Sequence, residues 1–303
     1  MDTAPSGAPA PPAPSGTTRT GAGSGTYAYF WRGSQRVEQP MGIAEQLADA
    51  AGLGAEVFQL CDEPRLDLLD GTGLAGLRRT AEDLGLALEV GTRGTRPEHL
   101  HRYLGIAETL GARLVRSMWT AGPADPEDRP DRGETERRLR EVLPDYARAG
   151  VTLALETYEQ VPTTALVDVV ETLGSEHLGI CLDPANTVAA LENPADVVAR
   201  CAPHVKNWHV KDFAFTRAEG WVGFTLTGAP LGEGLLDHDA VFAAVDPVRR
   251  GISRIAEHWL PWQGDPQTTT RTEAAWTATT LARLTRSTPD STRSRSTSDD
   301  RPG

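Results

Sequence analysis

The sequence predicts a single α/β domain folded as a closed (β/α)8 barrel, with a disordered tail at each end. Three observations support this prediction. Eight short apolar runs occur along the chain, and longer, mostly amphipathic segments separate them. This alternation implies a parallel sheet with helical crossovers. The central region of about 260 residues also has the length of one such barrel, which needs about 250.

Both ends of the 303-residue chain lack the residues that build a core. Residues 1–25 and residues 287–303 contain no Val, Ile, Leu, Phe, Tyr or Trp. Such segments cannot bury enough apolar surface to offset the entropy that is lost when a chain becomes ordered. We therefore expect disordered tails at 1–25 and 287–303, and one barrel domain at 26–286.

Most of the eight runs are continuously apolar rather than alternating, as expected for strands that are covered on both faces. No linker-like stretch divides them, so we predict one domain, with an open doubly wound sheet as the alternative. The predicted strands are residues 26–30, 55–62, 86–91, 113–119, 151–156, 178–183, 205–211 and 252–259.

The segments between the runs have helical periodicity. Residues 43–51, 97–110 and 139–143 place their aliphatic side chains on one face. Glycines such as Gly111 and Gly150 stand just before the following run, where they would end a helix. These features predict helices between the strands.

One glycine motif favours a different fold at first sight. Residues 71–76 fit the G-x-G-x-x-G pattern of dinucleotide-binding folds, but the preceding residues 65–70 are too polar for a buried strand. We expect Asp70 or Thr72 to cap a helix here instead, and we expect no nucleotide cofactor.

Charge and composition exclude several classes of protein. With 30 Lys and Arg against 42 Asp and Glu, the net charge of −12 disfavours binding to nucleic acid. No apolar run approaches the roughly 18 residues of a membrane span, and the N-terminus has no apolar signal core. Cys61, Cys181 and Cys201 lack C-x-x-C spacing, which indicates reduced, buried thiols and a cytoplasmic protein.

Four successive predicted strands end in an ionisable residue. These residues are Glu156, Asp183, His209 and Glu257, with separations of 27, 26 and 48 residues. The active site of a (β/α)8 barrel lies at this end of the strands. The third separation exceeds one strand–helix unit, and we assign the excess to a loop insertion at 214–234.

Three carboxylates and one imidazole form a hard, oxygen-rich ligand set. Isolated charges are costly to bury, and that cost falls if they converge on a cation. The set suits one divalent ion, Mn²⁺, Mg²⁺ or Co²⁺, better than a structural zinc. For any single acid, the alternative is a helix cap or an ion pair.

The segments ALET, CLDPAN, HVKD and EHW, with PLGEG at 230–234, resemble the xylose-isomerase-like TIM-barrel superfamily of sugar and sugar-phosphate isomerases and epimerases. The resemblance covers residues 26–286. It implies metal ligands at Glu156, Asp183, His209 and Glu257. Two positions depart from the ketose epimerases of this group, which commonly have His where this chain has Asn186 and Glu-Asn-His at the first ligand, where this chain has Glu-Thr-Tyr.

This resemblance implies a metal-dependent isomerase or epimerase of a small sugar, sugar phosphate or keto sugar acid. Glu156 and Glu257 would approach from opposite sides of the barrel axis, one removing a proton and the other returning it, by way of an enediolate. The alternative is a metal-dependent decarboxylase or dehydratase of a 3-keto sugar acid, similar to 3-oxo-isoapionate decarboxylase. An abasic-site nuclease fits the acidic core poorly, and a carbohydrate-sensing barrel is a further option.

Lysine occurs only at positions 206 and 211, against 28 arginines. Lys211 lies two residues after His209 and shares its facing on a strand, so we predict a catalytic role for it, with a strand-end ion pair as the alternative. His258 should face away from the barrel lumen.

Five further residues are predicted to contact a small carbohydrate-type substrate: Arg93, Arg116, Tyr158, Asn186 and Trp259. For the two arginines, the alternative is a salt bridge to Glu89 or another interior acid. For the two aromatic residues, it is simple core packing. A homo-oligomer is an option that the sequence leaves open.

Overall fold

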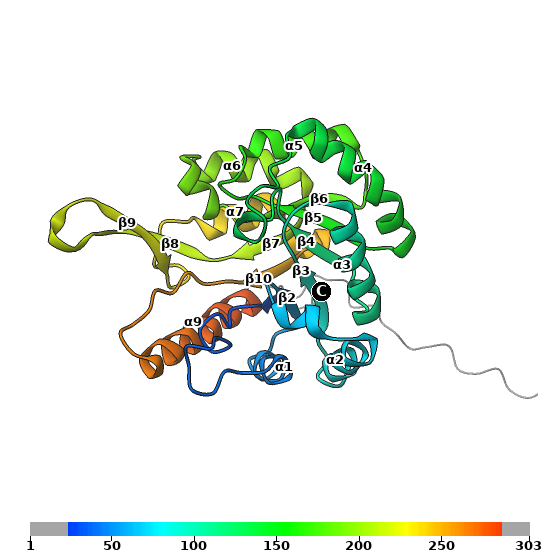
Figure 1. Ribbon diagram of the computed structural model, residues 1–303. Helices are drawn as coiled ribbons and strands as arrows, with labels where there is room; N and C mark the ends of the chain where they lie inside the picture. The colour runs from blue at the N-terminus through cyan, green and yellow to red at the C-terminus, as the bar shows by residue number, and fades with distance from the viewer. Residues whose placement is uncertain (1–23, 287–303) are drawn as a thin grey trace, which may run out of the picture.

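The computed structural model describes residues 24–286. Residues 1–23 of the predicted tail at 1–25, and all of the predicted tail at 287–303, lie outside these residues. Eight parallel strands close into a barrel in the order β1-β10-β7-β6-β5-β4-β3-β2 (Figure 1). The barrel strands are β1 Ser24–Thr26, β2 Val57–Cys61, β3 Ala87–Gly91, β4 Leu114–Ser117, β5 Thr152–Glu156, β6 Leu178–Leu182, β7 Val205–Val210 and β10 Ser253–Ala256.

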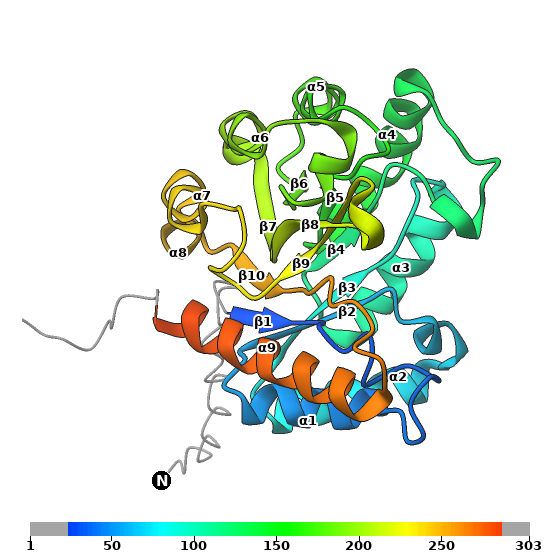
Figure 2. The same cartoon turned by 90° about the vertical axis from the view of Figure 1, so that its left-hand side faces the viewer.

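Helices surround the barrel, as the view onto one end of it shows (Figure 2). They are α1 Ile43–Gly52, α2 Gly71–Asp83, α3 Pro97–Leu110, α4 Arg132–Ala149, α5 Thr163–Leu173, α6 Pro194–Cys201, α7 His238–Val245, α8 Pro247–Arg250 and α9 Pro266–Arg286. The predicted helices at 43–51, 97–110 and 139–143 correspond to α1, α3 and α4. Gly111 and Gly150 end α3 and α4 in the left-handed conformation, as expected for C-cap glycines.

The barrel is closed because β1 pairs with both β10 and β2, so the open doubly wound alternative is wrong. β1 begins at Ser24, inside the predicted N-terminal tail, and ends at Thr26, so residues 27–30 of the predicted strand 26–30 are not part of it. The reason lies at Gly25, where an added Cβ would clash with the backbone carbonyl of Val57. The close approach of β1 to β2 requires this glycine, whose small size made the segment look like tail.

The segment 214–234 is not a simple loop insertion. It contains most of an antiparallel hairpin, β8 Asp212–Arg217 and β9 Phe224–Ala229, which extends outward from the carboxyl end of β7 (Figure 1). The carboxylate of Asp212 accepts hydrogen bonds from the backbone N–H groups of Gly232, Gly234 and Leu236. The first residue of β8 thereby fixes the chain that leads from the hairpin to α7.

Two smaller predictions are confirmed. The glycine motif at 71–76 lies in α2, follows a 3-10 turn instead of a strand, and is capped by Asp70, which accepts a hydrogen bond from the Gly73 N–H. All three cysteines are buried and free. Among residues 24–286, no helix is long and apolar enough to cross a membrane.

Candidate metal centre

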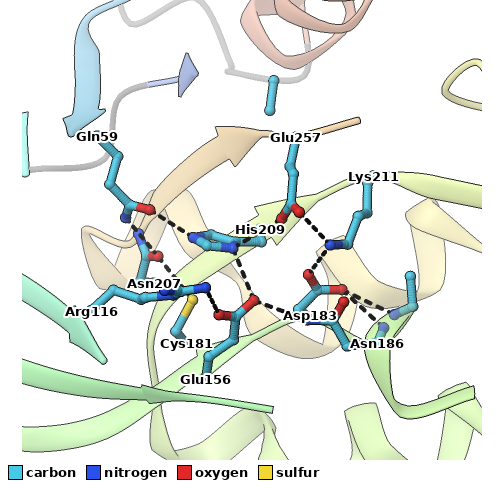
Figure 3. A network of polar contacts seen from close by, with 12 residues as sticks. Gln59, Arg116, Glu156, Cys181, Asp183, Asn186, Asn207, His209, Lys211 and Glu257 are labelled. Atoms are coloured by element: carbon cyan, nitrogen blue, oxygen red, sulfur yellow. Dashed lines mark hydrogen bonds and ion pairs between the residues drawn. The ribbon is translucent and has the colours of Figure 1, made fainter. Parts of the chain in front are cut away.

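The four predicted ligands converge at the carboxyl ends of their strands (Figure 3). Glu156 ends β5, Asp183 follows β6, His209 lies in β7 and Glu257 follows β10. One ligand atom from each residue lies within 4.8 Å of the corresponding atoms of the other three. These residues are called the four-residue centre below.

Each member of the four-residue centre carries a buried atom that lies against a charged side chain of the centre or its border but makes no well-oriented hydrogen bond among the described residues. These atoms are Glu156 Oε2, Asp183 Oδ2, His209 Nδ1 and Glu257 Oε2. His209 Nδ1 lies 3.2 Å from a carboxylate oxygen of Glu156 and 3.2 Å from one of Glu257. Three carboxylate oxygens and one imidazole nitrogen, buried together, are a donor set that fits a divalent cation.

Two buried side chains with positive charge border this set of ligands. Lys211 Nζ lies 2.7 Å from Asp183 Oδ2 and 2.6 Å from Glu257 Oε1. The guanidinium of Arg116 forms an ion pair with Glu156. The ion pair that was the alternative for Lys211 is therefore present, and its partners are two of the predicted ligands.

Burial and these two charged side chains shift the pKa values of the three carboxylates in different directions. Burial raises the pKa of Asp183 to about 7, against the opposing effect of Lys211. Burial also acts on Glu156 and Glu257, but Arg116 and His209 together outweigh it for Glu156 and lower that pKa to about 2. Lys211 and His209 outweigh it for Glu257 and hold that pKa well below its usual value. Both glutamates are thus ionised and available as ligands at neutral pH.

Asn186 lies against the four-residue centre. Its Nδ2 donates to Glu156 Oε1 at 2.9 Å and to the backbone carbonyl of Thr157 at 3.2 Å. Its own N–H and that of Ala185 donate to Asp183 Oδ1. The structure therefore places this predicted substrate contact where it holds two of the carboxylates.

A cavity of about 600 Å³ opens beside the four-residue centre. The other four predicted substrate contacts, Arg93, Arg116, Tyr158 and Trp259, line it, together with Glu156 and Glu257. The cavity volume suits a ligand of sugar size. The ring of Trp259 also lies 4.3 Å from Lys211 Nζ.

Neither Arg93 nor Arg116 forms the salt bridge to Glu89 that was one alternative for these two arginines. Arg93 forms a two-bond ion pair with Asp62, with distances of 2.8 and 2.7 Å. Arg116 Nη1 also lies 3.5 Å from this carboxylate. The acid that both arginines contact is thus Asp62, which is exposed, and the interior acid that pairs with Arg116 is Glu156. Glu89 instead binds Ser253 and two amide side chains below the centre.

Two further expectations concern the direction of side chains. The ring of His258 packs edge-on against Trp276 of α9, with 5.7 Å between centroids, as predicted. Glu156 and Glu257 do not lie directly opposite each other, because only β6 and β7 separate β5 from β10 in the barrel. Both carboxylates instead reach the same nitrogen of His209.

Sequence analysis did not identify Gln59, whose Oε1 lies 2.8 Å from His209 Nε2. The available signal was a lone amide at the centre of the apolar strand Val57–Cys61. It also missed Asp62, the partner of both arginines, which directly follows β2 in a left-handed conformation.

Comparisons with known proteins agree with this arrangement. The profile of the family described as xylose isomerase-like TIM barrel matches residues 47–280. The chain is 47% identical over 272 residues to 3-oxo-isoapionate decarboxylase of Pectobacterium atrosepticum, with 90% of this chain and 98% of that protein covered.

Two solved structures share the fold at low identity. One is D-psicose 3-epimerase in the presence of D-fructose, with a TM-score of 0.65, 13% identity, and 87% of this chain and 97% of that chain covered. The other is a xylose isomerase-like TIM barrel protein from Mycobacterium smegmatis in complex with magnesium, with a TM-score of 0.58, 18% identity, and coverages of 80% and 89%. With the family profile spanning most of the barrel, the chain belongs to the xylose isomerase-like TIM barrel family.

Proposed function

We propose that this protein is a divalent-metal-dependent decarboxylase of a 3-oxo sugar acid. The supporting observation is its 47% identity, across 98% of the relative's length, to 3-oxo-isoapionate decarboxylase. The isomerase or epimerase function, expected first from the sequence, has support only from structures at low identity, which share the fold. The decarboxylase alternative is therefore the better-supported function.

The charge of the site favours an acidic substrate. The four-residue centre contributes three carboxylates, and Arg116 and Lys211 contribute two positive charges. A divalent cation would leave this buried group with one excess positive charge. The carboxylate of a keto acid would neutralise that charge, whereas a neutral ketose would leave it unbalanced in a buried site.

Glu156, Asp183, His209 and Glu257 would hold the cation. As a Lewis acid, it would stabilise negative charge that develops on a substrate oxygen during the reaction. Asn186 would keep the Glu156 carboxylate in place, and the ion pair with Arg116 would keep that carboxylate ionised.

The reaction breaks the bond between the carboxyl carbon of the substrate and its C2. The electron pair of that bond moves toward the C3 carbonyl, CO₂ leaves, and a proton added at C2 completes the product ketone. Arg93 and Arg116 line the cavity and would orient the departing carboxylate. Lys211 donates a hydrogen bond to Glu257, which also lines the cavity, so this pair would deliver the proton.

The test is to incubate the Mn²⁺-loaded protein in D₂O with a 3-oxo sugar acid and, separately, with ketoses. The proposal predicts release of CO₂ and one deuterium on the product carbon, both lost after EDTA treatment and restored by Mn²⁺. Deuterium exchange into a ketose, with no CO₂ from the acid, would instead identify an epimerase.

A further inference from the structure

A buried polar network lies in the barrel lumen directly beneath the four-residue centre. Gln59 and Glu89 are register partners on β2 and β3, and Asn207 and Ser253 are partners on β7 and β10. All four side chains are buried. Since lumen-facing residues alternate along a strand, Asn207 stands one layer below His209 on β7.

The Glu89 carboxylate anchors this network. Its Oε2 accepts from Gln59 Nε2 at 3.0 Å and from Asn207 Nδ2 at 3.1 Å, and its Oε1 accepts from Ser253 Oγ at 2.5 Å. Burial raises the pKa of Glu89, and the hydrogen bonds from Ser253, Gln59 and Asn207 act against that shift. With three donors directed at its two oxygens, the carboxylate acts here as a hydrogen-bond acceptor. Both amides must therefore turn their nitrogen atoms toward Glu89.

The orientation of the Gln59 amide determines whether its oxygen or its nitrogen faces the His209 ring. Gln59 Nε2 is occupied by Glu89 and by Asn207 Oδ1, at 3.0 and 3.1 Å, so Oε1 faces the histidine ring. Gln59 Oε1 lies 2.8 Å from His209 Nε2 (Figure 3). A carbonyl oxygen only accepts, so Nε2 must carry a proton. The other ring nitrogen, Nδ1, faces Glu156 and Glu257.

We propose that Glu89 is a positioning residue for the four-residue centre. Through Gln59, it holds the His209 ring with the proton on Nε2 and leaves the Nδ1 lone pair for a divalent cation. Partners of this kind fix the tautomer and orientation of a metal-binding histidine. The inference rests on the metal part of the proposed function and is independent of the substrate.

The test compares Mn²⁺ binding to the metal-free wild-type protein and to Glu89→Gln, with free Mn²⁺ followed by electron paramagnetic resonance. A glutamine at 89 has an N–H group that can face Gln59, so the Gln59 amide can turn its own N–H toward His209. We expect Mn²⁺ affinity to fall about 10- to 100-fold. Glu273→Gln is the matched control, because Glu273 is also buried but accepts hydrogen bonds from the backbone N–H groups of Trp31 and Arg32. The Mn²⁺ affinity of this variant should equal that of the wild type.

The double variant Glu89→Gln with Gln59→Glu separates positioning from general structural damage. A carboxylate at 59 accepts from His209 Nε2 in either orientation, so Mn²⁺ affinity should return to within about threefold of the wild type. A merely structural role for Glu89 would leave the double variant at least as weak as the single one, and would overturn the proposal.

A wild-type measurement keeps the proposal falsifiable if these variants do not fold. In Mg²⁺-loaded protein labelled with ¹⁵N-histidine, the His209 proton should appear on Nε2, and a proton on Nδ1 would overturn the proposal. If Glu89→Gln bound Mn²⁺ as tightly as the wild type, the positioning role of Glu89 would be refuted, while the metal centre would stand. Failure of the wild-type protein to bind Mn²⁺ or Mg²⁺ would refute the metal centre itself.

Discussion

The Lys211 ammonium lies 2.6 Å from the Glu257 carboxylate, and its nitrogen is also 2.7 Å from Asp183 Oδ2. The lysine side chain is buried, and so is that of Asp183. Without a metal, this one cation compensates two of the three carboxylates in the four-residue centre. A bound divalent cation would take over much of that compensation, so lysine and metal should be partly exchangeable in stabilising the fold.

Replacing Lys211 with methionine tests whether a bound metal ion can substitute for the lysine charge in stabilising the fold. Loss of the cation leaves two buried carboxylates uncompensated, so the metal-free variant should lose about 3–5 kcal/mol of unfolding free energy. Urea denaturation with and without Mn²⁺ measures the change, and Mn²⁺ should recover part of the loss. Lys206→Met, on β7 shortly before Lys211 and lacking these contacts, should behave like the wild type. Equal losses for Lys211→Met with and without Mn²⁺ would argue against the exchange.

Arg93→Gln should affect substrate binding more than stability. The Arg93–Asp62 pair is partly exposed, with 40% of the arginine side chain accessible, so its removal should cost less than about 1 kcal/mol. Loss of a cation that orients the substrate carboxylate should raise KM about tenfold or more. Steady-state kinetics measures this, with Arg65→Gln, at another part of the cavity wall, as the control. An unchanged KM would remove Arg93 from the substrate site.

Asn186→Ala distinguishes two roles of the asparagine. Its hydrogen bond to Glu156 predicts that the variant binds Mn²⁺ about tenfold more weakly. A direct substrate contact would raise KM and leave Mn²⁺ affinity intact. Isothermal titration of the metal-free protein separates these outcomes. Asn193→Ala, which removes the N-cap of α6, should cost about 1 kcal/mol of stability and leave Mn²⁺ affinity unchanged.

Asp212 should make stability depend on pH. Burial opposes its charge, but His238 and the N–H groups of Leu236 and Gly232 outweigh this effect and lower its pKa to about 2. Because the folded-state pKa is below the unfolded value, the carboxylate stabilises the fold fully above about pH 5 and loses this effect as the pH falls toward 2.

Asp212→Asn should therefore lower the unfolding free energy by about 2 kcal/mol at pH 6. The gap to the wild type should shrink between pH 5 and pH 3 in urea titrations. Asp239→Asn, at an exposed position of α7, serves as the control. A gap that stays constant over this pH range would show that Asp212 does not act through its charge.

The barrel was predictable because seven of its eight strands, all but β1, lie in separate apolar runs of the sequence. The four-residue centre was predictable for a related reason, since a lone ionisable residue at the end of an apolar strand must lie at one edge of a parallel sheet. Gly25 was misread because a glycine required for close strand contact has the same composition as a disordered tail.

The network around Gln59 was not predictable in the same way. Gln59 and Asn207 are 148 residues apart, and their contact depends on the register of strands across the barrel lumen. Sequence periodicity shows which face a residue takes but not which residue it meets there. The hairpin at β8 and β9 was missed because its outer part is exposed and lacks the buried run by which the barrel strands were recognised.

The most direct test of the central claim uses a 3-oxo sugar acid labelled with ¹³C at its carboxyl carbon. The Mn²⁺-loaded protein should release one ¹³CO₂ for each substrate molecule consumed, and both EDTA and Glu257→Gln should abolish the release. Full ¹³CO₂ release by metal-free protein, or consumption of the acid with the label retained in the product, would contradict the account.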